Sequence, residues 1–503
     1  MTLNLSATEV LELAKSNRVI PVIDTLFSGT ETPVGLFQKL CGQRPGTFLL
    51  ESAAQGVWSR YSFIGVQSRG SLTKNLGEPA RWQGTGLAFP PEHNSSEGAL
   101  DALEQTLKAW STPKLENLPP LTSGLVGMLG WDVVREIEHL PNRPKSDYRV
   151  PEMWFAMVSD LVIVDHQKSQ LHLVANIFLE GDAPDAETSY QDALSRLAAL
   201  KKVILQPTNP FVTERSAEDT FSLAANQTQD TFLGAVSEAK KHIERGDVFQ
   251  VVLSQRFDQD LQATPLDVYR ALRALNPSPY MYLLQQSDEE GPYSIVGSSP
   301  EALVTVTDGE AVMHPIAGSR PRGASVEADH ANETSLLEDN KERAEHLMLV
   351  DLARNDLLKV CSPDSIEVTE FMAVHRFSHI MHLVSTVEGR VREGQSAVDV
   401  FRATFPAGTL SGAPKPRALE IIDALEPSSR GIFGGVVGYF DFAGSADLAI
   451  TIRTAFLRGG VARIQAGAGI VLDSVPQTEF DETRTKAAAP ARAVQAANGF
   501  GAN

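Results

Sequence analysis

A hairpin signal near the end of the chain constrains the fold more than any other local feature. Asp447–Leu457 and Val461–Ala466 both have strand-like composition, and Arg458 and two glycines lie between them. A glycine pair between two such runs is typical of a tight turn that pairs its flanking strands antiparallel. The chain also lacks a regular alternation of strand and helix. We therefore expect an α+β fold built on antiparallel sheets, not a doubly wound parallel sheet.

Other segments carry recognisable strand or helix patterns. Helices are expected over Asp132–His139 and Ala186–Val203. A third helix is predicted where apolar residues recur at helical spacing before a terminating glycine, at Phe232, Val236, Ala239, Ile243 and then Gly246. Strands are predicted in short runs rich in β-branched and aromatic residues: Thr47–Ser52, Trp58–Ile64, Met153–Asp165, Leu171–Phe178 and Val248–Ser254.

One segment has the composition of a linker. Leu205–Asp219 carries two prolines, many polar residues and no hydrophobic period. We therefore divide the chain into an N-terminal region (1–204), a linker (205–220), a larger C-terminal region (221–490) and a flexible tail (491–503).

The charge balance excludes several classes of function. The chain has 503 residues with 44 Lys and Arg against 63 Asp and Glu, a net charge of −19. Such an acidic protein is not expected to bind nucleic acid or an anionic membrane. No apolar run is long enough for a membrane helix, and the N-terminus does not resemble a signal peptide. With only two cysteines, a cytoplasmic location is expected.

Two acidic helices could hold a metal ion. Ser474 and Gln477 have the spacing of a capping box, which would start a helix with Glu479 and Glu482 on one face and Lys486 one turn further on. Glu345 lies in a second acidic helix, just before an apolar run. Such carboxylates suit Mg²⁺, which takes oxygen ligands. The alternative is a solvated helix face with a Glu482–Lys486 ion pair.

Three further features could contact a ligand. Gly467 and Gly469 end a strand and would leave backbone N–H groups accessible, unless they only form a turn. Strand alternation would give Arg453 small face-mates at 449, 451 and 455, with room for a carboxylate beside the guanidinium; a structural salt bridge is the alternative. His379 and His382 would face opposite sides of one strand, so at most one of them points into a given site.

Three blocks together carry a resemblance to a known family. Leu347–Asp356, Gly408–Lys415 and Gly467–Lys486 resemble the chorismate-utilising enzymes, and among them the large subunits of anthranilate synthases. The resemblance covers about residues 48–487. It implies an α+β fold of large interleaved antiparallel sheets, in a sandwich flanked by helices. The C-terminal region would then bind chorismate and carry the catalytic site.

The resemblance also assigns the site. It implies that Glu345 and Glu482 hold Mg²⁺, with Glu479 close by, and that Glu301 protonates the departing C4 hydroxyl. His382, and not His379, matches the catalytic histidine. The remaining positions around the substrate are Gly318, Ser319, Thr409, Tyr439, Arg453, Gly467, Ala468, Gly469 and Lys486; Ser319 stands where the family usually has threonine.

Two positions separate the relatives. Enzymes that add water to chorismate carry a lysine where this chain has Gln250, so ammonia is the expected nucleophile. Ala317 favours anthranilate over aminodeoxychorismate, whose synthases commonly have lysine there. Cys41 lacks the context of a glutaminase nucleophile. A glutamine amidotransferase subunit should therefore supply the ammonia, in a heterotetramer of two large and two small subunits.

The resemblance finally implies feedback inhibition by tryptophan. Ser52, in the N-terminal region, and Pro279, Tyr280 and Met281 match the contacts of that regulatory site. A strand end and a proline turn are the alternative explanation of these two segments. Two other functions stay open: an aminodeoxychorismate synthase component I, and a non-catalytic tryptophan-binding regulator.

Overall fold

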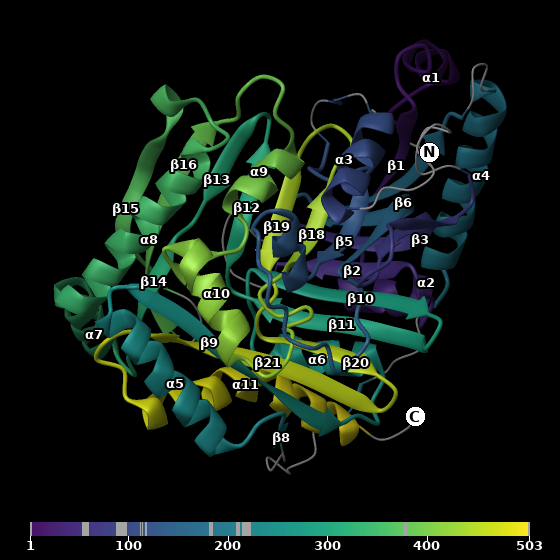
Figure 1. The fold of residues 1–503 in the computed structure, drawn as a ribbon. Coiled ribbons are helices and arrows are strands. Elements are labelled where there is room, and N and C mark those ends of the chain that lie inside the picture. Colours follow the sequence, from purple (N-terminus) through teal and green to yellow (C-terminus); the bar gives the residue numbers. More distant parts are fainter. Residues whose placement is uncertain are drawn as a thin grey trace.

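The structure is a computed structural model that describes residues 3–52, 60–86, 98–110, 112, 114–115, 118–180, 185–207, 212–213, 223–376 and 380–500 (Figure 1). Its α-helices are α1 (Ala7–Leu13), α2 (Pro33–Leu40), α3 (Ala99–Ala109), α4 (Ala186–Ile204), α5 (Gln229–Glu244), α6 (Pro265–Leu275), α7 (Val326–Glu338), α8 (Asn340–Leu358), α9 (Ala397–Thr404), α10 (Lys415–Leu425) and α11 (Pro476–Asn498). Short 3-10 helices are η2 (Trp131–Glu136), η3 (Pro363–Ser365) and η4 (Gly408–Leu410).

The described strands join into one hydrogen-bonded network of 21 strands. They are β1 (Val19–Phe27), β2 (Thr47–Glu51), β3 (Tyr61–Lys74), β4 (Arg81–Gly84), β5 (Leu125–Leu129), β6 (Met153–Asp165), β7 (Gln170–Phe178), β8 (Ala224–Ala225), β9 (Gln250–Asp260), β10 (Tyr280–Asp288), β11 (Gly291–Ser299), β12 (Ala302–Thr307), β13 (Glu310–Met313), β14 (Ile316–Pro321), β15 (Glu367–Arg376), β16 (Ile380–Arg390), β17 (Gly412–Ala413), β18 (Val436–Phe440), β19 (Ala446–Ile450), β20 (Thr454–Arg458) and β21 (Val461–Ile470). The α+β class with large antiparallel sheets is confirmed.

Strands from both sides of the expected linker pair with each other. β2 pairs antiparallel with β10, so that Glu51 is opposite Met281, and β5 pairs with β18. Of the linker itself, only residues 205–207 and 212–213 are described. The regions before and after it therefore share one continuous sheet network.

Helices cover the sheet on the side of β9 and β21. Figure 1 shows α5 and α11 below these two strands and α10 above β9. Phe232 and Val236 of α5 are fully buried, and Phe232 packs edge-on against Phe480 of α11. These apolar faces fix the helices that carry the acidic residues against the strands that carry the glycines.

Several local predictions hold. β6 has the predicted bounds, α4 and β7 differ from theirs by one residue, and α5 ends before Gly246, whose φ of +79° is the left-handed conformation expected of a helix stop. The hairpin β20–β21 turns through Gly459 and Gly460, both with positive φ. His379 and residues 53–59 lie outside the described part of the chain.

Other local predictions are wrong. The 132–139 helix is the 3-10 helix η2. α11 has Val475 at its N-cap with no side-chain cap, and the Ser474 hydroxyl accepts instead from Val471 N–H, so no capping box forms. The same helix continues to Asn498 through part of the expected tail, because Ala493 and Val494 are buried in the core. Among the described residues, no helix has the length and apolar content needed to cross a membrane.

Candidate active site

Glu301 is a carboxyl group in an unusual environment. It lies between β11 and β12, and Thr409 Oγ1, from η4, donates a hydrogen bond of 2.8 Å to its Oε1. Burial raises the pKa of Glu301 to about 7, against the opposing effects of the Thr409 bond and of the positive charges on Lys486 and Arg453. A carboxyl group with a pKa near neutrality can be protonated at physiological pH, as a general acid requires.

His382 is oriented by a backbone carbonyl. Its Nδ1 lies 2.8 Å from Gly318 O. Because a carbonyl only accepts, Nδ1 carries the proton, and the lone pair of the neutral ring is on Nε2. Burial lowers the pKa of His382; the hydrogen bond to Gly318 opposes this shift, and the nearby charge of Arg453 adds to it. The ring is thus held neutral close to Arg453.

Gly318 and Ser319 lie on β14, beside His382. Gly318 has a φ of +67°, and a Cβ there would lie 3.0 Å from the Leu336 side chain and 3.2 Å from Glu342. Glycine therefore suits this position on both conformational and steric grounds. Ser319 is the register partner of His382.

Arg453 is not in a strand. The expected continuous strand breaks between β19 and β20, and Arg453 lies in the break with a φ of +50°. The alternation that we expected to give it small face-mates is therefore wrong. Burial lowers the pKa of Arg453, and the charge of Glu301 opposes that shift, so the guanidinium lies within electrostatic reach of the acid.

The glycine segment lies against Gln250. Gly467 and Gly469 of β21 pair with Ser254 and Val252 of β9. A Cβ at Gly469 would lie 2.7 Å from Gln250 Nε2, so the Gln250 amide covers that stretch of backbone. Gln250 Oε1 is buried and has no hydrogen-bond partner in the described part of the chain. Ala468, between the two glycines, is fully buried in the core.

The three predicted metal ligands interact with one another. Burial raises the pKa of Glu345 on α8, and the negative charges of Glu342 and Glu482 raise it further. Burial also raises the pKa of Glu479. The hydrogen bond from Ser474 opposes that rise, and the charge of Glu482 adds to it. Lys486 Nζ lies 2.6 Å from Glu482 Oε1 and 3.1 Å from Gly467 O. Glu482 of α11 thus lies within electrostatic reach of Glu345 on α8 and of Glu479, and it forms an ion pair with Lys486 beside the glycine segment.

This acidic group fits a magnesium ion only in part. Among the described residues, no three His, Cys, Asp or Glu side chains are close enough together to hold a metal by themselves. Mg²⁺, however, is usually bound through one or two carboxylates together with water and substrate oxygens. Mutual repulsion between Glu345 and Glu482 is what a divalent cation would relieve.

A larger cavity joins the two predicted halves of a regulatory site. It has a volume of about 840 Å³, and Ser52, Pro279, Tyr280 and Met281 all line it. The β2–β10 pairing brings these segments together. Ser52 Oγ is buried and has no hydrogen-bond partner among the described residues. Pro300 and Ala302, the two neighbours of Glu301, line the same cavity.

Tyr439 belongs to this cavity. It lines the cavity together with Ser52 and Tyr280, and its contact with the substrate stays a prediction from the family resemblance. It is the register partner of Asp447, which also lines the cavity. Burial raises the pKa of Asp447 to about 6, the Tyr280 hydroxyl bonds to this carboxylate, and its Oδ1 has no hydrogen-bond partner in the described part.

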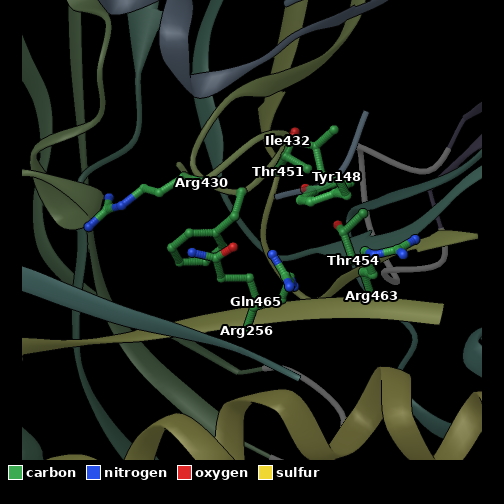
Figure 2. Close-up of a pocket in the computed structure, with 9 residues that line it drawn as sticks. Tyr148, Arg256, Arg430, Ile432, Thr451, Thr454, Arg463 and Gln465 are labelled. Carbon is green, nitrogen blue, oxygen red and sulfur yellow. The ribbon is translucent and has the colours of Figure 1, made fainter. Parts of the chain in front are cut away.

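Asp447 and a group of arginines, two of them buried, were missed by the sequence analysis. Asp447 could have been singled out, since a carboxylate in an apolar strand is unusual. Figure 2 shows a second, small cavity, of about 10 Å³, whose lining includes Arg256, Arg430 and Arg463. Arg430 and Arg256 each have one ion-pair partner nearby in the sequence, Glu426 and Asp258, but their other partners come from distant segments that no local pattern marks.

Comparison with known proteins gives consistent matches over nearly the whole chain. The family model described as chorismate binding enzyme matches residues 47–492. Anthranilate synthase component 1 of Arthrobacter globiformis is 52% identical over 498 residues, which cover 97% of this chain and 92% of the relative. The protein of the same name from Mycolicibacterium smegmatis is 49% identical, covering 96% and 92%.

Solved structures give the same picture of the fold. The crystal structure of anthranilate synthase component I from Streptococcus pneumoniae superposes with a TM-score of 0.74 at 33% identity, over 93% of this chain and 99% of that one. The menaquinone-specific isochorismate synthase of Escherichia coli has a TM-score of 0.69 at 17% identity, over 97% and 99%, and shares the fold.

Proposed function

The chain belongs to the family of chorismate-binding enzymes, and we propose that it converts chorismate and ammonia into anthranilate, pyruvate and water. The observation that carries the proposal is Glu301, a carboxyl group with a pKa raised to about 7 that is hydrogen-bonded by Thr409 and lies near two positive charges. Loss of a hydroxyl group needs an acid that is protonated near neutral pH, and Glu301 meets that condition.

The cationic groups suit a dianionic substrate. Arg453 and Lys486 would bind carboxylates of chorismate, beside the backbone of Gly467–Gly469. Glu301 then gives its proton to the C4 hydroxyl group, which leaves as water while ammonia attacks C2. Neutral His382, with its lone pair on Nε2, is placed to accept a proton as pyruvate is eliminated and the ring becomes aromatic.

We assign the metal position to Glu345 and Glu482, with Glu479 beside them. These carboxylates would hold Mg²⁺, which would supply positive charge opposite the ring carboxylate of the substrate. Lys486, which pairs with Glu482, then also remains close to Gly467 O, and so to the substrate. An acidic protein can thereby bind a dianion.

Gln250 supports ammonia, rather than water, as the nucleophile. Its amide covers Gly469 at the site, and a neutral amide cannot deprotonate water. Ala317 in β14 is the residue that favours anthranilate over aminodeoxychorismate.

The ammonia would come from a separate glutamine amidotransferase subunit. The chain has two cysteines, and burial raises the pKa of Cys41 to about 12 and that of Cys361 to about 11. Neither thiol is therefore available as the thiolate nucleophile that glutamine hydrolysis would need. The relatives are named component 1, which implies a second component. We propose a cytoplasmic heterotetramer of two large and two small subunits.

Tryptophan is the proposed inhibitor that binds in the 840 Å³ cavity. An amino acid presents an ammonium group, and Asp447 offers a buried carboxylate oxygen without a partner among the described residues. Ser52 Oγ is a second polar group in the same situation, and Pro279, Tyr280 and Met281 supply apolar surface. These features favour a zwitterion with a large apolar side chain.

The identity of the product formed from chorismate tests the proposed function. The purified chain should be supplied with chorismate, Mg²⁺ and ammonium, and the products should be separated and identified by mass. Anthranilate and pyruvate in equal amounts are expected. Aminodeoxychorismate, or a hydroxylated product such as salicylate, would assign the chain to another branch of the family, and no turnover would favour a tryptophan-binding regulator.

A further inference from the structure

Arg430 is the largest fully buried side chain in the described part of the protein. It lies between α10 and β18, with its guanidinium 4.2 Å from the centre of the Trp131 ring and 5.5 Å from that of Phe433. Figure 2 shows Arg430 among the residues that line the small cavity. Burying a guanidinium is costly unless every donor is satisfied, so its partners identify what it holds together.

The guanidinium joins two backbone segments. One terminal nitrogen donates to Leu410 O at 2.7 Å, and the other donates to Val252 O at 2.9 Å. Two further bonds, of 2.9 and 2.6 Å, reach the carboxylate of Glu426, which is itself buried. A planar fork of donors can make these bonds at once, whereas an ammonium group cannot.

Glu426 extends the network to β21. Its Oε1 accepts hydrogen bonds from both the backbone N–H and the hydroxyl group of Ser254, each at 2.8 Å. Gln465 Nε2 in turn donates to Ser254 Oγ at 2.8 Å. The network therefore runs without a break from η4 through Arg430 to the strand that ends in the glycine segment.

The backbone groups at the two ends belong to the candidate active site. Leu410 directly follows Thr409, whose hydroxyl bonds to Glu301. Val252 and Ser254 are the register partners of Gly469 and Gly467. The acid and the glycine backbone come from different elements, and Arg430 is bonded to a neighbour of each: to η4, whose Thr409 contacts the acid, and to β9, which pairs with the glycine strand β21.

We propose that Arg430, with Glu426, is a positioning residue that sets the distance between the Glu301–Thr409 pair and the Gly467–Gly469 backbone. This inference rests on the proposed function, since these two groups act on the same substrate. Arg430 does not touch the reacting atoms. It acts through Thr409 on one side and through β9 on the other.

The test is Arg430→Lys, with anthranilate formation measured across pH and rates expressed per concentration of free ammonia. Lysine keeps the charge opposite Glu426 but cannot bond Leu410 O and Val252 O together. The value of kcat should fall by about 10- to 100-fold, as for other small misplacements of catalytic groups. Displacement of Thr409 removes a bond that lowers the pKa of Glu301, so the alkaline limb of the profile should move to higher pH.

A matched control is Arg135→Lys. Arg135 donates to both carboxylate oxygens of Asp423 on α10, to Leu140 O and to Asp132 Oδ1, but it bonds neither η4 nor β9. This variant should lose thermal stability while its pH profile stays where the wild-type profile is. If both lysine variants behave alike, Arg430 is merely structural and the inference is wrong.

Ser254→Ala is a second test of the positioning role of Arg430, for use if Arg430→Lys does not fold. It removes one hydroxyl between Glu426 and Gln465, on the glycine side only, so the KM for chorismate should rise while the alkaline limb stays in place. An unchanged KM would overturn the inference. A wild-type chain that makes no anthranilate would instead overturn the proposed function, so the two failures are distinguishable.

Discussion

Thr409 donates its hydroxyl hydrogen to the carboxylate of Glu301 across 2.8 Å, although the two residues come from different elements of the fold. The bond is the largest of the effects that oppose burial and keep the pKa of Glu301 from rising above about 7. The proton on Glu301 is therefore controlled by a residue that can be changed without removing the acid.

Thr409→Val should move the pH profile. Without the hydroxyl group, the carboxylate loses a stabilising donor and the pKa of Glu301 rises. Since the acid is lost as pH increases through this pKa, the alkaline limb of kcat/KM should shift to higher pH. Glu301→Gln should lower kcat by about 10²- to 10⁴-fold. Thr404→Val, which removes a buried hydroxyl bonded to a helix carbonyl, is the control and should leave the limb in place.

Glu345→Gln and Glu482→Gln should each abolish turnover through loss of Mg²⁺. Calorimetric titration with Mg²⁺ should show binding to the wild type in the presence of chorismate and weak or absent binding to either variant. Asp351→Asn is the control, because Asp351 lies on α8 but is exposed and pairs with Arg354. Wild-type affinity for Mg²⁺ in one variant would remove that residue from the metal site.

The isolated chain should use ammonium but not glutamine. Both thiols are buried with raised pKa values, so Cys41→Ser should leave the ammonium-dependent rate nearly unchanged. Addition of an amidotransferase subunit should restore glutamine use to wild type and variant alike. Glutamine-dependent activity in the pure chain would contradict this assignment.

Ser52→Phe should make the enzyme resistant to tryptophan while kcat is nearly unchanged. The substituted side chain fills part of the cavity and removes a polar contact, which should cost the inhibitor about 1–3 kcal/mol of binding free energy. Inhibition curves for the wild type and the variant measure the difference, with exposed Ser146→Phe as the control. Equal sensitivity of Ser52→Phe and wild type would place the inhibitor elsewhere.

Tryptophan binding should weaken in acid. Burial raises the pKa of Asp447 to about 6, so this carboxyl group gains a proton and loses its charge as pH falls through that value, while the ligand ammonium stays charged. Binding measured by calorimetry, and not by rate, avoids the titration of Glu301. Asp447→Asn should bind more weakly than the wild type above pH 6 and show no such dependence.

The sequence predicted what depends on neighbouring residues. The glycine turn of β20–β21, the bounds of β6 and the buried face of α5 follow from local periodicity and turn residues, and the structure confirms them. The pairing of β2 with β10 has no local signal, because residues far apart in the chain set its register. Only the family resemblance connected Ser52 with Met281, and the cavity that both line agrees with it.

Failures in the site have specific physical reasons. Strand alternation predicts small face-mates for Arg453, but its left-handed backbone interrupts the strand, and the guanidinium lies within electrostatic reach of Glu301. The assignment of Tyr439 to the substrate still depends on the resemblance alone, and the structure adds that this residue lines the large cavity opposite Asp447. Arg430 was missed because its partners lie in three separate segments, and a buried arginine has no spacing pattern of its own.

Pro300 and Ala302 line the large cavity, whereas the carboxyl group of Glu301, between them, accepts the hydrogen bond from Thr409 in the candidate active site. Three consecutive residues therefore serve two sites. The residues that line the cavity are therefore not equivalent as positions for substitutions that confer resistance to the inhibitor. Exchanges at Ser52 alter the cavity alone, whereas an exchange at Pro300 or Ala302 also shifts the peptide that carries the acid. Substitutions selected for both resistance to the inhibitor and a high rate of synthesis should therefore occur at Ser52 and not at Pro300 or Ala302.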